Sequence, residues 1–94
     1  MATSLSEERV LRTTDLTLAA YLTIEGFSPQ EVEMEGETVK SGHPQGAWEF
    51  EETPALKRCV EEYNRGEARV DPRAFHSQVN ETRREMFRFL GIGR

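Results

Sequence analysis

The sequence is poor in residues that cross-link a chain or carry it through a membrane. It contains a single cysteine, so no disulfide can form within the chain. Its longest uninterrupted apolar run, Leu18 to Leu22, is far shorter than the roughly 20 residues that a membrane-spanning helix needs. The first ten residues contain no apolar stretch of the kind found in secretory signals. We therefore expect a cytoplasmic protein that makes no membrane contact.

Metal ligands and catalytic motifs are equally scarce. His43, Cys59 and His76 are far apart in the sequence, with no Cys-x-x-Cys or His-x-x-x-His spacing. Cys59 falls in a helical apolar stripe, where a small buried residue is typical. A Cys/His nucleophile pair would require the fold to bring these residues together. The sequence thus predicts no metal, no cofactor and no enzymatic activity.

The size and charge of the chain set further limits. It has 94 residues, of which 36% are hydrophobic and 31% charged, so we expect one small core under a highly charged surface. The net charge of −5 opposes sequence-independent binding of nucleic acid by the molecule as a whole. We assign residues 1–12 to a flexible N-terminal arm and residues 13–94 to a single domain.

Capping residues and apolar spacing predict three helices. Thr13-Thr14-Asp15 can cap a helix whose wide apolar arc indicates a central position. Thr53-Pro54 and Asp71-Pro72 each pair a cap residue with a proline in the first turn. The glycines that end the three helices are Gly26, Gly66 and Gly91. The apolar stripes expected in the later two are Leu56, Cys59, Val60 and Tyr63, then Phe75, Val79, Thr82, Met86 and Phe89 or Leu90.

Alternating side chains predict two strands between the first and second helices. Over residues 29–39, Val32 and Met34 point to one side and glutamates to the other, which gives the strand a solvated acidic face. Trp48 and Phe50 point inward from the second strand, which begins after a loop. The predicted fold class is α+β: a helix, an antiparallel β-hairpin, then two helices packed on one small core.

The charges divide unevenly along the chain. Residues 1–52 hold 3 basic and 11 acidic side chains, whereas residues 53–94 hold 9 basic and 6 acidic ones. The acidic residues of the hairpin, with the histidine of its tip, are Glu31, Glu33, Glu35, Glu37 and His43. Such a row either protects the edge of a sheet from aggregation or forms a docking surface for a basic partner.

Arginines concentrate on the last helix. Those that could face phosphates are Arg73, Arg83, Arg84 and Arg88. Glu81 and Glu85 lie three residues before Arg84 and Arg88, so the same arginines could instead form a salt-bridged solvent face. Phe87 lies off the apolar stripe and is expected to be exposed, where a partner or a second copy could cover it.

Three segments together resemble a known family. They are Thr13-Thr14-Asp15-Leu16 with Leu18-Ala19-Ala20-Tyr21-Leu22, the strand Trp48-Glu49-Phe50-Glu51, and the run from Tyr63 to Phe75. They are similar to an uncharacterised family of small bacterial and phage domains of unknown function, over about residues 13–90. The resemblance implies a bacterial or phage source, often within a mobile element, and no established activity.

Two functions remain open at this point. The first is a non-enzymatic interaction or regulatory domain that binds a protein partner through the acidic hairpin. The same hairpin could also join two copies of the chain. The alternative is an accessory nucleic-acid-binding protein that uses the arginine-rich C-terminal helix.

Overall fold

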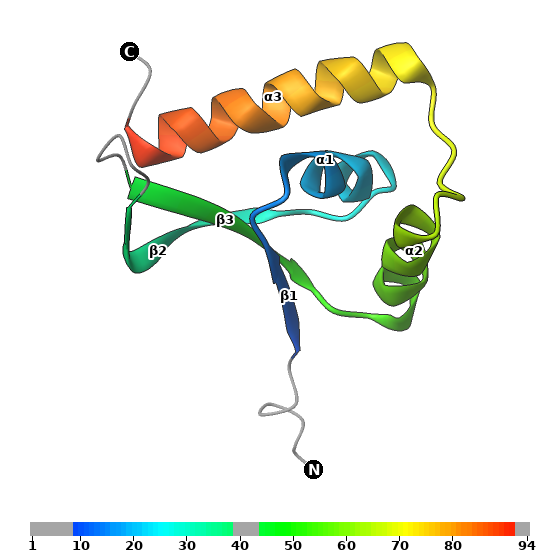
Figure 1. The fold of residues 1–94 in the computed structure, drawn as a ribbon, viewed down its shortest axis with the longest axis horizontal. Coiled ribbons are helices and arrows are strands. Elements are labelled where there is room, and N and C mark those ends of the chain that lie inside the picture. Colours follow the sequence, from blue (N-terminus) through cyan, green and yellow to red (C-terminus); the bar gives the residue numbers. More distant parts are fainter. Residues whose placement is uncertain (1–8, 39–43, 92–94) are drawn as a thin grey trace.

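Six elements follow one another in the part of the chain that the structure describes. The computed structural model describes residues 9–38 and 44–91. The elements, shown in Figure 1, are β1 (Val10–Thr13), α1 (Leu16–Ile24), β2 (Gln30–Thr38), β3 (Pro44–Glu51), α2 (Pro54–Asn64) and α3 (Pro72–Leu90). The predicted α+β class, with a helix, a hairpin and two further helices, is confirmed.

Each helix begins at the capping residue that the sequence indicates. The Asp15 carboxylate accepts hydrogen bonds from the backbone N–H groups of the first turn of α1. Thr53 Oγ1 accepts one from Leu56 N at 3.1 Å, and Asp71 Oδ2 accepts one from Ala74 N at 2.9 Å. These side chains satisfy N–H groups that would otherwise lack an intrahelical partner. They therefore fix the first turns of all three helices.

The sheet has one more strand than the sequence indicated. Its order is β1-β3-β2 with both pairings antiparallel, so β3 is central. The assignment of residues 1–12 to a flexible arm is wrong from residue 10 onward, because Val10–Thr13 pairs with β3. Four residues are too few for a reliable alternation pattern, and this strand owes its conformation to its neighbour. Residues 1–8 lie outside the described part of the chain.

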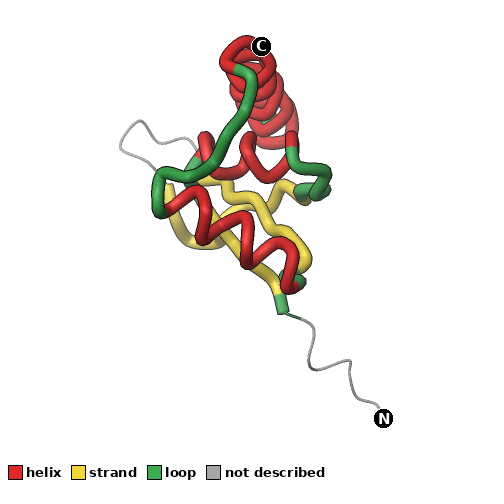
Figure 2. The backbone as a smooth tube through the Cα atoms, turned by 90° about the vertical axis from the view of Figure 1, so that its right-hand side faces the viewer, coloured by secondary structure: helices red, strands yellow, loops and turns green. Residues whose placement is uncertain are grey.

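The core lies between the helices and one face of the sheet. Both views place α1 between α3 and the strands (Figures 1 and 2). Residues 18–22 of α1 are buried on all sides, as expected for a central helix. The largest fully buried side chains are Phe50, Leu22 and Leu56. The predicted stripe of α2 and the inward positions of Trp48 and Phe50 are confirmed.

A glycine in β3 sets the approach of α3 to the sheet. A Cβ atom at Gly46 would lie 2.4 Å from Met86 Sδ and 3.2 Å from Leu90 Cδ1. The side chains of Met86 and Leu90 therefore occupy the space over β3 that a side chain at position 46 would need. Leu90, not Phe89, completes the core stripe of α3, since Phe89 is 49% exposed.

Candidate functional site

A hollow of ≈ 680 Å³ opens between α3, β2 and the end of α1. Its wall on α3 is formed by Gln78, Glu81, Glu85, Arg88 and Phe89, and its wall on β2 by Glu31. We call it the α3–β2 hollow. Three of these six side chains are carboxylates and one is a largely exposed aromatic ring. The combination suits a ligand that carries positive charge beside an apolar group.

Glu31 of β2 lies on the helix-covered face of the sheet, contrary to the sequence-based prediction. Glu31 lies directly opposite Trp48 in the antiparallel register, and opposed residues share one face of the sheet. Trp48 is buried in the core, so Glu31 lies on the helix-covered face, and Val32 lies on the other face beside Ala47. Alternation groups residues by face but does not say which face the helices cover. Glu31 therefore lies beneath α3, and not on the face of the sheet turned away from the helices.

The structure describes the other residues of the predicted hairpin set to different extents. Glu33 lies opposite Gly46, on the same face of the sheet as Glu31, and is exposed. Glu35 and Glu37 belong to β2, and their side chains are not among those described. His43 lies outside the described residues. Of the two hairpin glutamates whose side chains the structure describes, Glu31 lines the α3–β2 hollow and Glu33 does not.

Negative charge gathers around Glu85. Burial raises the pKa of the Glu85 carboxyl above its usual value. Hydrogen bonding with Glu81, followed by repulsion from Glu81 and Glu31, acts in the same direction, and the nearby Arg88 guanidinium acts in the opposite one. Glu81 and Glu31 thus both act against the ionised form of Glu85. An added cation would relieve that repulsion.

Replacing Glu85 with glutamine is expected to stabilise the chain at neutral pH. The folded-state pKa is raised above the unfolded value, so the folded chain binds the proton more tightly. The resulting stability is present in acid and is lost as the pH rises through the raised pKa. Glutamine cannot ionise, so Glu85→Gln avoids this loss of stability. The free energy of unfolding of the variant should therefore exceed that of the wild type at neutral pH, and the difference should vanish in acid. Urea unfolding at both pH values measures it.

The same substitution at an exposed position provides the control. Glu61 lies on the exposed side of α2, away from the hollow. Glu61→Gln removes one carboxylate charge in the same way, and the difference between the two variants isolates the contribution of the hollow. A Glu85→Gln chain whose advantage does not change with pH would contradict the role given to charge repulsion in the hollow.

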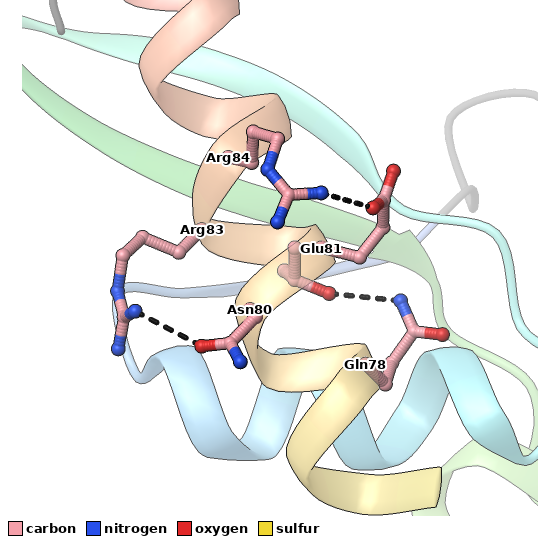
Figure 3. Close-up of polar contacts among 6 residues, drawn as sticks. Gln78, Asn80, Glu81, Arg83 and Arg84 are labelled. Carbon is pink, nitrogen blue, oxygen red and sulfur yellow. Dashed lines mark hydrogen bonds and ion pairs between the residues drawn. The ribbon is translucent and has the colours of Figure 1, made fainter.

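The arginines of α3 divide between two sides of the helix. The predicted pair between Glu81 and Arg84 is confirmed, with Arg84 Nη1 donating to Glu81 Oε1 at 2.8 Å (Figure 3). Arg83 lies next to Arg84 on the solvent-facing side and donates to Asn80 Oδ1 at 3.2 Å. Arg88 lines the α3–β2 hollow. The four arginines therefore do not form one continuous surface.

The solvent-facing side of α3 carries positive charge and an exposed ring. We call it the outer face of α3, and its residues are Arg73, His76, Asn80, Arg83, Arg84 and Phe87. Their spacing of three and four residues places them on one side of the helix. Phe87 is 42% exposed, as the sequence predicts. This face and the α3–β2 hollow thus carry charges of opposite sign on the same helix.

The first turn of α3 is already capped. Asp71 accepts the backbone N–H of Ala74, and its negative charge lies beside Arg73 in the sequence. An anion at this end of the helix would compete with the Asp71 carboxylate for the same N–H groups. The arginine at position 73 therefore belongs to the outer face, and not to a separate anion site.

Cys59 and His76 lie on different helices, and His43 lies outside the described residues. Cys59 is half-buried on α2, where burial raises the pKa of its thiol and disfavours the thiolate. His76 is exposed on α3, within 3.3 Å of Asn80 Nδ2. Across residues 9–38 and 44–91, no group of three His, Cys, Asp or Glu side chains is arranged to hold a metal ion.

Two residues of the hollow's wall on α3 escaped sequence reasoning. Gln78 and Phe89 are adjacent on the helical wheel to the apolar stripe of α3, so the pattern gave them no separate role. The sequence left open whether Phe89 or Leu90 completes the apolar stripe of α3. Because two consecutive helical residues point in different directions, one of these two apolar side chains had to lie outside the core. That residue is Phe89, which lies at the rim of the α3–β2 hollow.

Fold and hollow together define a small α+β domain with a charged hollow on its surface. The chain belongs to the family described as a domain of unknown function (DUF5659), whose model matches residues 8–88. No curated protein and no solved structure matches the chain. In the part of the chain that the structure describes, no helix has the length and apolar character needed to cross a membrane.

Proposed function

We propose that this chain is a small non-enzymatic interaction domain that binds a basic segment of a protein partner in the α3–β2 hollow. The observation that carries the proposal is the register that turns Glu31 toward α3. It brings a carboxylate from β2 into the hollow that Glu81 and Glu85 line from α3. Arg88 is the one cation among the described residues that line this hollow.

The chemistry of the lining defines the partner segment. Glu81 already accepts from Arg84, so Glu31 and Glu85 are the carboxylates that a new cation would meet. An arginine suits this role because its guanidinium can bridge two carboxylates through a planar array of donors. The exposed ring of Phe89 at the rim offers contact to an apolar side chain. A segment with arginine next to an aromatic residue fits both features.

A labelled peptide tests the proposal. The probe is a fluorescein-labelled peptide of alternating arginine and phenylalanine, titrated with the chain and followed by fluorescence anisotropy. Removing both carboxylate charges, with Glu31→Gln and Glu85→Gln together, is expected to weaken binding about tenfold, as for other close charge pairs. Glutamine keeps the size of each side chain, so the hollow keeps its shape.

The controls separate local from global charge. Glu51→Gln and Glu61→Gln together remove the same charge from two exposed positions outside the hollow and should leave binding unchanged. A peptide in which glutamate replaces arginine should not bind. Equal affinity of the arginine peptide for both double variants would refute the proposal.

A further inference from the structure

The outer face of α3 carries an exposed ring beside charges opposite in sign to the carboxylates of the hollow. Arg83 and Arg84 lie four and three residues before Phe87, so the two guanidinium groups flank one exposed ring on the same side of the helix. Phe87 and Phe89 are two residues apart, which turns them about 200° from each other around the helix axis. Phe87 therefore cannot reach the hollow of its own chain, although it is exposed and surrounded by positive charge.

We propose that the α3–β2 hollow binds the outer face of α3 of a second copy of this chain. In this contact Phe87 of one copy lies against Phe89 of the other, and Arg83 and Arg84 lie beside Glu31 and Glu85. The inference rests on the proposed function of the hollow and names its partner. Charge complementarity and the paired exposed rings are the observations that select this occupant.

The geometry of this contact is head-to-tail. The two surfaces that meet are different, so each bound copy still offers one free hollow and one free outer face. Such a heterologous contact builds rings or open chains of copies, whereas a symmetric contact stops at a dimer. At about 0.15 M salt the Debye length is about 8 Å, so charges at the contact outweigh the net charge of each copy.

The existing partners of the two arginines do not prevent this contact. Arg84 forms an exposed ion pair with Glu81, and Arg83 an exposed hydrogen bond with Asn80. Exposed pairs of this kind contribute little to stability, so their side chains can turn to a new carboxylate. The outer face could alternatively contact nucleic-acid phosphates, but phosphate contacts make no use of an exposed phenylalanine. The ring at its centre favours a protein surface.

Two defective variants tested together provide the decisive experiment. Glu31→Gln with Glu85→Gln disables the hollow, and Arg83→Glu with Arg84→Glu disables the outer face. Sedimentation velocity of each variant alone should show at least about a tenfold loss of self-association. An equimolar mixture should form a dimer and nothing larger, because one functional hollow meets one functional outer face. The wild type should form larger species with rising concentration.

Matched controls keep the surface charge comparable. Arg58→Glu with Arg69→Glu reverses two exposed charges outside both surfaces, and Glu51→Gln with Glu61→Gln removes two exposed acids. Both control chains should associate as the wild type does. Far-ultraviolet circular dichroism of all variants shows whether each is folded, and the recovery of a dimer in the mixture shows that both defective variants are.

Each contrary outcome has a distinct meaning. A wild type that stays monomeric while the arginine peptide still binds the hollow overturns this inference and leaves the proposed function standing. A mixture that fails to associate, with a self-associating wild type, overturns the head-to-tail contact. A wild type that neither binds the peptide nor self-associates overturns both proposals. Binding of labelled duplex DNA that Arg83→Glu with Arg84→Glu abolishes, without self-association of the wild type, assigns the outer face to nucleic acid instead.

Discussion

Phe50→Ala is expected to remove about 3–5 kcal/mol from the free energy of unfolding. Phe50 is 1% exposed on the central strand and packs in the cluster that joins the sheet to the helices. The substitution deletes the ring and leaves a cavity, because the neighbouring side chains can close it only in part. Small domains have a total stability of about 5–15 kcal/mol, so the loss is a large share of it. Urea unfolding measures the difference.

An exposed phenylalanine serves as the control for this substitution. Phe89→Ala removes the same atoms from a ring that is 49% exposed. Exposed substitutions usually change stability by about 0.5 kcal/mol or less, so this variant should unfold close to the wild type. Equal losses at positions 50 and 89 would mean that the core does not lie where the structure places it.

Gly46→Val is expected to destabilise the chain by about 1–3 kcal/mol, as for other overpacked cores. The new Cβ would lie 2.4 Å from Met86 Sδ, so Met86 or the whole C-terminal half of α3 must move. Movement of α3 away from β3 would also separate Glu85 from Glu31, and peptide binding in the hollow should weaken in the same variant. Thermal unfolding and the anisotropy titration measure the two effects.

A double substitution tests whether the effect acts through Met86. Met86→Ala vacates the space that the valine needs, so the pair Gly46→Val with Met86→Ala should cost less than the sum of the single changes. Gly66→Ala gives the comparison, since Gly66 has φ of +75° and no atom within 4 Å of its built Cβ. Its cost comes from the backbone and should add to that of Met86→Ala. If the costs of Gly46→Val and Met86→Ala were also additive, the close approach of α3 to β3 would be contradicted.

The helices could be predicted almost residue by residue because their signals are local. A cap residue such as Asp15 or Asp71 acts on N–H groups two or three positions away, within reach of a sequence pattern. Gly91, with φ of +76°, ends α3 where the sequence indicates. Local chemistry of this kind depends little on the rest of the fold.

The candidate site could not be predicted in the same way because it depends on register. Whether Glu31 or Val32 faces the helices is decided by the pairing of Glu31 with Trp48, which joins two separate strands. A shift by one residue would exchange the two faces, and the sequence of β2 alone does not exclude it. The hollow further requires α3 to cross β2, an arrangement that no single segment specifies.

The order of the strands has a consequence for a chain that is still being synthesised. β1 is made first, but it pairs with β3, and Arg12 and Glu49, the ion pair across that boundary, are 37 residues apart. β2 and β3 are close in sequence, and the hairpin they form needs a much shorter loop to close. A ribosome must therefore have released Glu51 before the first strand can complete its ladder. Of the three strands, β1 is synthesised first, yet its partner β3 is synthesised last.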